Sequence, residues 1–374
     1  MTAKRTHHPF HIYETIMNAP DVLSSWMHDE DARETIERVS EKIMCLQPHH
    51  IFITGTGSSY MASIAQSWAF NHIAHIPSTA SVRSELMTYT PVHFTGNSVL
   101  ILNTHSGKSP GDVEMIKFAH KRGAYTIGIT DIPDSPFAKV VQDLIIGQEG
   151  PKYEMPSTRT YSSAIFRVLL LAVSCARRLV SAYSAREYEE KIRRIPDIMR
   201  AFLHAFDKQA QDIVGQLIEQ KAFFIIGSGP NMSTAYEGAM GLTQGTGMPT
   251  AGYIVDEYMH GPIQSLTQGM CVVSIAAPGP FQRRIGKFTS TARNLGAKTI
   301  ILAPEGSDVL TEGDIGIALP GGVPEVFTPV YYCAPFWLLG YYFSLEKKLD
   351  PDNLSMGKEI FKNSGLAELK REIY

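Results

Sequence analysis

Short apolar runs rich in β-branched residues alternate along the chain with longer amphipathic segments, which is the pattern of βαβ units around a parallel sheet. In the first half it predicts strands at residues 51–55, 98–104, 125–130 and 144–147, and helices near 60–75 and 111–122. In the second half it predicts strands at 223–227, 252–255, 271–277, 299–303 and 315–319, and helices near 233–244 and 282–295. The alternation predicts an α/β fold.

The second half repeats the first. Residues 51–57 (Ile-Phe-Ile-Thr-Gly-Thr-Gly) match residues 223–229 (Phe-Phe-Ile-Ile-Gly-Ser-Gly) at an offset of 172, and a small, polar helix start follows each. The repeat predicts two tandem, doubly wound, flavodoxin-like parallel sheets. A mostly helical stretch at 159–220 lies between them, so we expect a helical N-terminal segment at 1–45, one domain at 46–200, a second at 201–346, and a C-terminal tail at 347–374 over the active site.

Composition and charge fit a globular protein of two or three domains. The 374 residues are 44% hydrophobic and 19% charged, which excludes disordered, collagenous and disulfide-scaffold classes. With Lys+Arg 34 against Asp+Glu 37 the net charge is −3, so no global field is expected to hold a nucleic acid or an acidic membrane surface. Any bound anion must be met locally.

Cysteine usage and the apolar runs predict a cytoplasmic protein. The cysteines are far apart in apolar or helical surroundings, which indicates buried, reduced thiols. They are Cys45, Cys175, Cys271 and Cys333. The N-terminus lacks the apolar stretch of a signal peptide. The longest apolar run, 330–343, is interrupted by Pro335 and falls short of the about 18 residues of a spanning helix, so we expect a core or dimer-interface helix.

Two loops place glycine and hydroxyl groups directly after predicted strands and before predicted helices. Residues 55–60 (Gly-Thr-Gly-Ser-Ser-Tyr) lie at a helix N-terminus, where unpaired N–H groups attract anions. This loop is neither the dinucleotide fingerprint nor a nucleotide P-loop, and helix-start serines are often simple N-caps. Residues 102–109 add Thr104, Ser106 and Ser109.

Neighbouring strands of one doubly wound sheet would direct both loops into the crevice beyond their carboxyl ends. One phosphate would then collect donors from both loops. We expect no arginine in this site, so its charge balance would come from backbone dipoles, with Lys108 as the candidate cation. Such a site suits the terminal phosphomonoester of a small molecule better than a long polyanion.

Nearly the whole chain resembles the SIS (sugar isomerase) phosphosugar-binding family, and within it the tandem isomerase half of glucosamine-6-phosphate synthase. The resemblance runs through residues 13–20, 57–60, 104–109, 157–159, 237–239 and 257–262, and it reaches Lys358. It implies a phosphate site lined by Ser58, Ser59, Thr104, His105, Ser106 and Ser109. It also implies further substrate positions at Ser157 and Gln244, ring opening by His260 across a dimer interface, and an amine, Lys358, that reaches the sugar carbonyl.

Two positions depart from the synthase. Its helix after the first strand of the second half carries a Lys and a Glu, and the Glu moves the proton between C1 and C2. The aligned residues here are Gly241 and Gln244. An amide is not a base at neutral pH, and aldose–ketose isomerisation needs one. Related enzymes that remove an amine from phosphorylated Amadori compounds also lack the Lys but keep a Glu.

A substitute for the missing base is expected near His260. Glu257 precedes His260 by three residues, and a carboxylate and an imidazole so placed can share acid and base roles. The alternative for Glu257 is a structural ion pair or cap. His260, followed by Gly-Pro, is expected in a rigid exposed turn. No metal site is expected, because no Cys, Asp or Glu completes a coordination set with the paired histidines at 49–50 or at 72 and 75.

We therefore expect a phosphosugar isomerase, deaminase or deglycase that acts on an amino or Amadori-type hexose 6-phosphate of the glucosamine-6-phosphate or fructosamine-6-phosphate class. No glutaminase domain precedes these domains, so glutamine-derived ammonia is not expected from the same chain. A homodimer with shared sites is expected, without a cofactor, metal, nucleic acid or membrane partner. The alternative is a non-catalytic sugar-phosphate sensor, which Gln244 favours and which the retained Glu257, His260 and Lys358 argue against.

Overall fold

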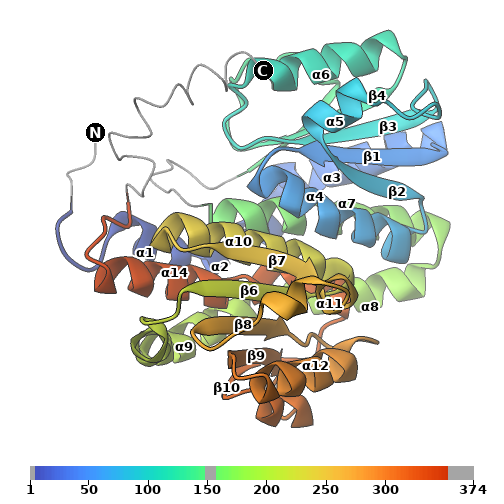
Figure 1. Ribbon diagram of the computed structural model, residues 1–374. Helices are drawn as coiled ribbons and strands as arrows, with labels where there is room; N and C mark the ends of the chain where they lie inside the picture. The colour runs from blue at the N-terminus through green and yellow to red at the C-terminus, as the bar shows by residue number, and fades with distance from the viewer. Residues whose placement is uncertain (1–4, 148–156, 353–374) are drawn as a thin grey trace. The chain divides into compact units, whose positions relative to one another are not determined.

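The computed structural model describes residues 5–147 and 157–352. These residues form two compact units, each built around a five-stranded parallel sheet (Figure 1). The first-sheet unit contains residues 21–147 and 159–196, and the second-sheet unit contains residues 5–20, 157–158 and 197–352. In the described part of the chain, no helix has the length and apolar character needed to cross a membrane.

The first sheet has the strand order β2-β1-β3-β4-β5, which is the flavodoxin-like order. Its strands are β1 (His50–Gly55), β2 (Ser78–Val82), β3 (Ser98–Asn103), β4 (Tyr125–Thr130) and β5 (Asp143–Ile146). Every residue of β3 and β4 is buried, because both faces of a parallel sheet are covered by helices. The strand order reverses direction between β1 and β3, so loops after these two strands diverge to opposite faces and leave a crevice.

Helices cover the first sheet on two faces (Figure 1). They are α2 (Ala19–His28), α3 (Glu30–Leu46), α4 (Ser58–Ala69), α5 (Arg83–Thr88), α6 (Pro110–Lys121), α7 (Arg159–Leu179) and α8 (Ala182–Arg193). Helix α7 contacts α3, α4 and α8, and α5 contacts α6. The predicted helix at 60–75 is α4 continued by a short π-helical segment, Phe70–Ala74.

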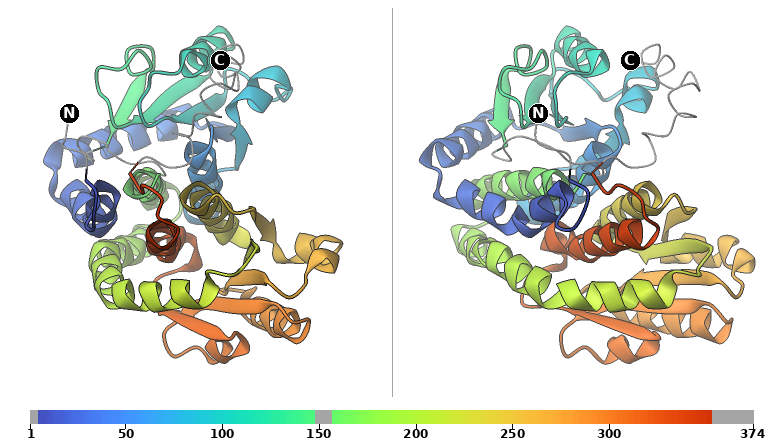
Figure 2. Two further views of the ribbon diagram at one scale, coloured as in Figure 1. Left: turned by 60° about the vertical axis from the view of Figure 1, so that its left-hand side comes forward. Right: turned by 90° about the vertical axis from the view of Figure 1, so that its left-hand side faces the viewer.

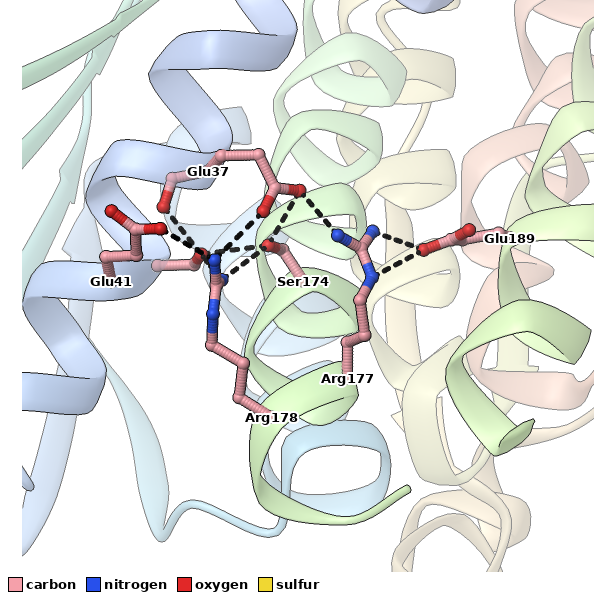
Figure 3. A network of polar contacts seen from close by, with 7 residues as sticks. Glu37, Glu41, Ser174, Arg177, Arg178 and Glu189 are labelled. Atoms are coloured by element: carbon pink, nitrogen blue, oxygen red, sulfur yellow. Dashed lines mark hydrogen bonds and ion pairs between the residues drawn. The ribbon is translucent and has the colours of Figure 1, made fainter. Parts of the chain in front are cut away.

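Charged side chains join α3, α7 and α8 (Figure 3). Arg177 donates to Glu37 at 2.9 Å and to Glu189 at 3.1 Å, and Arg178 donates to Glu41 at 2.8 Å. The side chains of Arg177 and Arg178 are 40% and 32% exposed. Each ion pair alone therefore contributes little to stability. Together the ion pairs link three helices through one network.

The second sheet repeats the first with the order β7-β6-β8-β9-β10. Its strands are β6 (Ala222–Gly227), β7 (Thr250–Ile254), β8 (Met270–Ile275), β9 (Lys298–Pro304) and β10 (Ile315–Leu319). The helices of this unit are α1 (His11–Met17), α9 (Ile195–Leu217), α10 (Met232–Thr246), α11 (Val255–Met259), α12 (Gln282–Asn294), α13 (Pro329–Tyr332) and α14 (Ala334–Glu346), with 3-10 turns η2 to η5 between them. The predicted α/β class and tandem flavodoxin-like sheets are confirmed. The domain ranges given above stay a prediction.

The apolar run at 330–343 is a core helix of the second-sheet unit. All residues of α14 from Ala334 to Ser344 are buried, and the helix lies along α10 (Figure 2). Pro335 stands in the first turn of α14, where a missing N–H leaves no helical bond unmade. A helix that is hydrophobic on every side belongs inside a protein, so α14 does not offer the dimer surface expected as an alternative.

Two expectations about the first-sheet unit were wrong. Strand β2 was not predicted, because Ser78–Val82 is an edge strand of mostly half-exposed, polar residues and has no apolar run. Cys45 is exposed near the end of α3, whereas Cys175, Cys271 and Cys333 are buried. Burial raises the pKa of the Cys175 thiol to about 12, which makes this thiol unreactive at neutral pH.

Candidate functional site

The two hydroxyl-rich loops both begin at the carboxyl ends of strands in the first sheet. Strands β1 and β3 pair in parallel, with Thr54 opposite Leu102. Residues 56–59 follow β1 and residues 104–109 follow β3, so both loops begin at carboxyl ends of neighbouring strands. This placement is the switch point at which flavodoxin-like sheets bind ligands.

Glycines let the β1 loop turn sharply into α4. A Cβ on Gly55 would lie 2.7 Å from the backbone of Ser59, so only glycine allows the first turn of α4 to approach the strand end. Gly57 precedes the helix with φ of 61°, a left-handed conformation that favours glycine. Ser58 and Ser59 therefore occupy the first turn of α4, where the helix dipole favours an anion.

The β3 loop is held by its own hydroxyl groups. Thr104 Oγ1 accepts a hydrogen bond from the Gly107 N–H at 3.3 Å, and Ser106 Oγ accepts one from the Lys108 N–H at 3.4 Å. Ser109 is the N-cap residue of α6. The three hydroxyls are half-buried and Lys108 is exposed.

A buried arginine stands beside this loop, so the expectation of a site without arginine was wrong. Arg83 is the first residue of α5, directly after β2, and is 4% exposed. Its Nη1 donates to Ser109 Oγ at 3.1 Å and forms an ion pair with the carboxylate of Asp112 in α6. The signal was missed because β2 itself was not recognised, and only the sheet order places the end of β2 next to the β1 loop.

Asp112 balances the charge of Arg83. Burial raises the pKa of Asp112 above its usual value, whereas Arg83 and a hydrogen bond from Thr104 oppose that rise. A carboxylate and a guanidinium that are both buried hold each other in place, because either one alone would be an uncompensated charge. Ser109 is thereby held at a fixed position in the loop.

His105 belongs to a second buried charge cluster that the sequence did not reveal. Its Nδ1 bonds to the carboxylate of Asp131, the first residue after β4. Asp131 also accepts from Arg167 Nη2 at 2.9 Å. Arg167, in α7, donates to the carbonyl oxygens of Thr130 and Ile145 at 3.2 and 3.4 Å, so it spans the ends of β4 and β5. Within the described ranges, no three His, Cys, Asp or Glu side chains are grouped to hold a metal ion.

The remaining predicted residues belong to other parts of the chain. Gln244 lies in α10 with its Oε1 buried and without a hydrogen-bond partner among the described residues. Ser157 is half-buried just before α7. Lys358 lies outside the described residues. The structure thus brings Ser58, Ser59, Thr104, His105, Ser106 and Ser109 to one sheet edge.

Glu257 and His260 are both exposed at the end of α11. His260 Nδ1 donates to the Asp256 carbonyl oxygen at 2.7 Å, which turns Nε2 away from the helix end. Asp256 accepts from Arg284 at 2.8 Å. No hydrogen bond or ion pair of the described residues joins the side chains of Glu257 and His260, so this pair is not bonded in the chain as it stands.

The equivalent loops of the second sheet have a different chemistry. Gly229 matches Gly57 at the offset of 172 and has φ of 56° against 61°. The hydroxyl side chains are not repeated: the residues matching Ser58, Ser59, Thr104, Ser106 and Ser109 are Pro230, Asn231, Ala276, Pro278 and Phe281.

A carboxylate occupies the space between these second-sheet loops. A Cβ on Gly279 would lie 2.0 Å from Glu325 Oε2, and one on Gly229 would lie 3.6 Å from Oε1. Burial raises the pKa of Glu325 to about 7. An anionic ligand would meet this carboxylate, so the hydroxyl-rich loops of the first sheet are the better phosphate site.

Comparison with known families identifies the family to which the two sheets belong. The model of the SIS domain family matches residues 44–174 and 216–334. The chain belongs to the SIS domain family. This match confirms the resemblance on which the candidate residues were chosen.

Similar proteins are named as sugar-phosphate enzymes. The glutamine–fructose-6-phosphate aminotransferase (isomerizing) of Methanothermobacter thermautotrophicus is 27% identical over 342 residues, which are 91% of this chain and 55% of that protein. The chain therefore spans about half the length of the curated relatives it matches.

Solved structures share the fold. The C-terminal domain of glucosamine-fructose-6-phosphate aminotransferase from Francisella tularensis aligns with a TM-score of 0.84 at 18% identity, over 94% of this chain and 99% of that chain. Tagatose-6-phosphate ketose/aldose isomerase from Escherichia coli aligns with a TM-score of 0.78 at 19% identity, over 94% of this chain and 96% of that chain. At these identities the likeness establishes the fold of two SIS domains.

Removing one charge of the Arg83–Asp112 pair is predicted to destabilise the fold, whereas removing both charges is not. Arg83→Gln leaves the Asp112 carboxylate buried without its partner, which should lower the free energy of unfolding by about 3 to 5 kcal/mol. Arg83→Gln with Asp112→Asn should recover most of that loss, because no charge then remains buried. Urea unfolding of both variants measures this. A single variant within about 1 kcal/mol of the native protein would contradict the pairing.

Glu325 predicts a pH-dependent stability. Its folded-state pKa of about 7 lies above the ordinary value of 4.5, so its protonated form stabilises the fold at low pH and that contribution is lost as the pH rises through 7. Glu325→Gln cannot ionise, so its Tm relative to the native protein should rise between pH 5 and pH 8. Calorimetry at both pH values measures the difference.

Glu305→Gln, at an exposed glutamate after β9, is the matched control and should show no such trend. A Tm difference for Glu325→Gln that is the same at both pH values would contradict the buried carboxyl.

Proposed function

We propose that this SIS protein is a phosphosugar isomerase- or deaminase-type enzyme that acts on an amino or Amadori-type hexose 6-phosphate. The observation that carries the proposal is the meeting of two hydroxyl-rich loops at the β1–β3 switch point, with a buried arginine behind one of them. The relatives support an enzyme of this class, because they are named as an isomerizing aminotransferase and a ketose/aldose isomerase. A deglycase is the third activity that this substrate class permits.

The phosphate of the substrate is proposed to bind between the two loops. The N-terminus of α4 supplies a partial positive charge, and Ser58 and Ser59 lie in its first turn. The β3 loop adds the hydroxyls of Thr104, Ser106 and Ser109 from the opposite side. Arg83 polarises the Ser109 hydroxyl, because its guanidinium donates to the hydroxyl oxygen and leaves that O–H free to donate to a ligand.

The chemistry requires movement of a carbon-bound proton and opening of the sugar ring. Gln244 is proposed to contact substrate as an amide and not as a base. His260 is proposed to open the ring, with Nε2 as its available nitrogen, and Glu257 is the nearby carboxylate that the chain order offers as a base. Lys358 is proposed as the amine that reaches the sugar carbonyl.

A homodimer in the cytoplasm is proposed as the working form. Its support is the exposure of His260 together with a hollow of about 510 Å³ beside it, lined in part by Met259, Ile263 and Phe288. A second copy of the chain is the proposed occupant, because the family resemblance implies that His260 opens the ring across a dimer interface.

The proposal predicts both binding and proton exchange. In deuterated water, proton NMR with hexose, hexosamine and fructosamine 6-phosphates should show exchange at C1 or C2 for at least one compound. Ser59→Ala and Ser106→Ala should each weaken binding of that compound by about 10 to 150-fold, because each removes a hydrogen bond to a charged group. Calorimetry measures the affinity.

Ser67→Ala is the matched control, since its hydroxyl donates to the Ile64 carbonyl oxygen within α4. Unchanged affinity in both loop variants would remove the phosphate site. Binding without exchange in any compound would favour the sugar-phosphate sensor over the enzyme.

The shared site predicts complementation between inactive variants. If His260 completes the site of the neighbouring subunit, a mixture of Ser59→Ala and His260→Ala chains should regain part of the exchange activity that each has lost alone. NMR exchange on the mixture, after subunits have been allowed to re-associate, measures the gain. A monomer by light scattering at the assay concentration would rule the shared site out.

A further inference from the structure

We propose that His105 is the base that carries the proton between the two reacting carbons, with Asp131 as its positioning residue. The inference rests on the proposed function, since it assigns a role within the same phosphosugar site. The family resemblance counts His105 among the residues that line the phosphate. Its ring, however, is bonded toward the end of β4, one strand farther from the Ser58–Ser59 loop.

The contact with Asp131 fixes which ring nitrogen of His105 carries the proton when the ring is neutral. Asp131 is 3% exposed at its side chain and accepts from Arg167, which is itself 1% exposed. The oxygens of an ionised carboxylate can only accept hydrogen bonds. The Nδ1 atom that contacts Asp131 therefore carries the proton, and Nε2 of the neutral ring holds the free lone pair. This is the tautomer that a general base requires.

The backbone of His105 is held as firmly as its ring. Its carbonyl oxygen accepts from Thr130 Oγ1 at 2.9 Å and from the Asp131 N–H at 3.2 Å. The preceding residue, Thr104, donates its N–H to the Ile129 carbonyl oxygen at 2.9 Å. The side chain of His105 is nevertheless 25% exposed, so the ring is fixed and still reachable. Such preorganisation is what proton transfer to a bound substrate needs.

The position of His105 suits the far end of the substrate. The proposed phosphate site lies between the β1 and β3 loops, and β4 is the next strand beyond β3, about 4.8 Å away. In a hexose 6-phosphate the reacting carbons C1 and C2 lie at the opposite end from the phosphate. A sugar that extends from the phosphate site across the end of β3 reaches the edge between β3 and β4, where the His105 ring is bonded.

A purely structural role explains these contacts less well. Arg167 already pairs Asp131 and donates to the carbonyl oxygens of Thr130 and Ile145, so the ends of β4 and β5 are held without the His105 ring. A ring that is a quarter exposed has water available and does not need a buried carboxylate. Glu257, the other candidate base, is exposed and is not bonded to His260.

The proposed step balances its protons and electrons. Nε2 takes the proton from the carbon next to the carbonyl, the C–H electron pair forms the carbon–carbon double bond, and the carbonyl π pair moves to oxygen to give an enediolate. The imidazolium then returns the proton to the neighbouring carbon. The hydroxyl proton of the enediolate passes to the other oxygen as the carbonyl forms again, so His105 ends as it began.

The test compares binding with exchange. His105→Gln keeps a side chain that can donate to Asp131 but has no basic nitrogen, so C1/C2 exchange should fall by about 10² to 10⁴-fold. The affinity of the same phosphosugar, measured by calorimetry, should stay within a few-fold. Asp131→Asn should lower kcat by about 10²-fold or more with KM little changed, since an amide can present the wrong partner to Nδ1.

Two controls make the outcome decisive. His120→Gln changes a histidine in the last turn of α6, which contacts Thr126 at the start of β4 and not its carboxyl end, and should leave exchange unchanged. Added imidazole should raise the exchange of His105→Ala but not that of Ser59→Ala.

The inference would be overturned if the exchange rate of the His105→Gln variant stayed within a few-fold of the native rate. It would also be overturned if this variant lost phosphosugar affinity by as large a factor as it lost exchange. It would equally be overturned by an imidazole effect that is absent or the same in both alanine variants. If native protein bound no phosphosugar or catalysed no exchange, the proposed function would fail together with it. If the native protein exchanged and His105→Gln did too, only the role of His105 would fail.

Discussion

The parallel pairing of β1 with β3 is the interaction on which the candidate site depends. The chain leaves β1 for β2 on one side and then crosses over to β3 on the other, so the two strands that carry the hydroxyl-rich loops become neighbours although 48 positions separate Ile51 from its β3 partner Val99. Their backbone hydrogen bonds place both loops at one edge. Without this pairing, Ser58–Ser59 and Ser106–Ser109 would be two unrelated helix starts.

Buried charges then give that edge its chemistry. Arg83 with Asp112, and Arg167 with Asp131, each bury both members of an ion pair. Such pairs add little to stability in comparison with an apolar core, because removing two charges from water costs about as much as their attraction returns. Their effect here is positional. One pair holds the hydroxyl of Ser109 and the other holds the ring of His105.

The two sheets show how one fold carries two different edges. The strand order recurs, and the left-handed glycine after the first strand recurs at the offset of 172 as Gly57 and Gly229, because the backbone geometry of a flavodoxin-like sheet demands them. The side chains at the loops are free of that demand. In the first sheet they are hydroxyls beside a buried arginine, whereas in the second a carboxylate, Glu325, lies between the same two loops. The charge of the loop side chains, and not the topology, therefore distinguishes the candidate phosphate site of the first sheet from the equivalent loops of the second sheet.

The sequence by itself determined the repeat, the fold class and the loop residues, because these depend on local patterns: apolar runs of strand length, glycines at fixed turns, and hydroxyls after strand ends. It did not determine β2, whose polar residues at an edge give no apolar signal. For the same reason it did not reveal Arg83, which acts only because β2 ends beside β1. Asp131 and Arg167 lie 26 and 62 positions from His105 in the sequence, and no spacing rule links them. Only tertiary structure decided that the strand ends meet, because parallel pairing joins residues that are far apart in the chain.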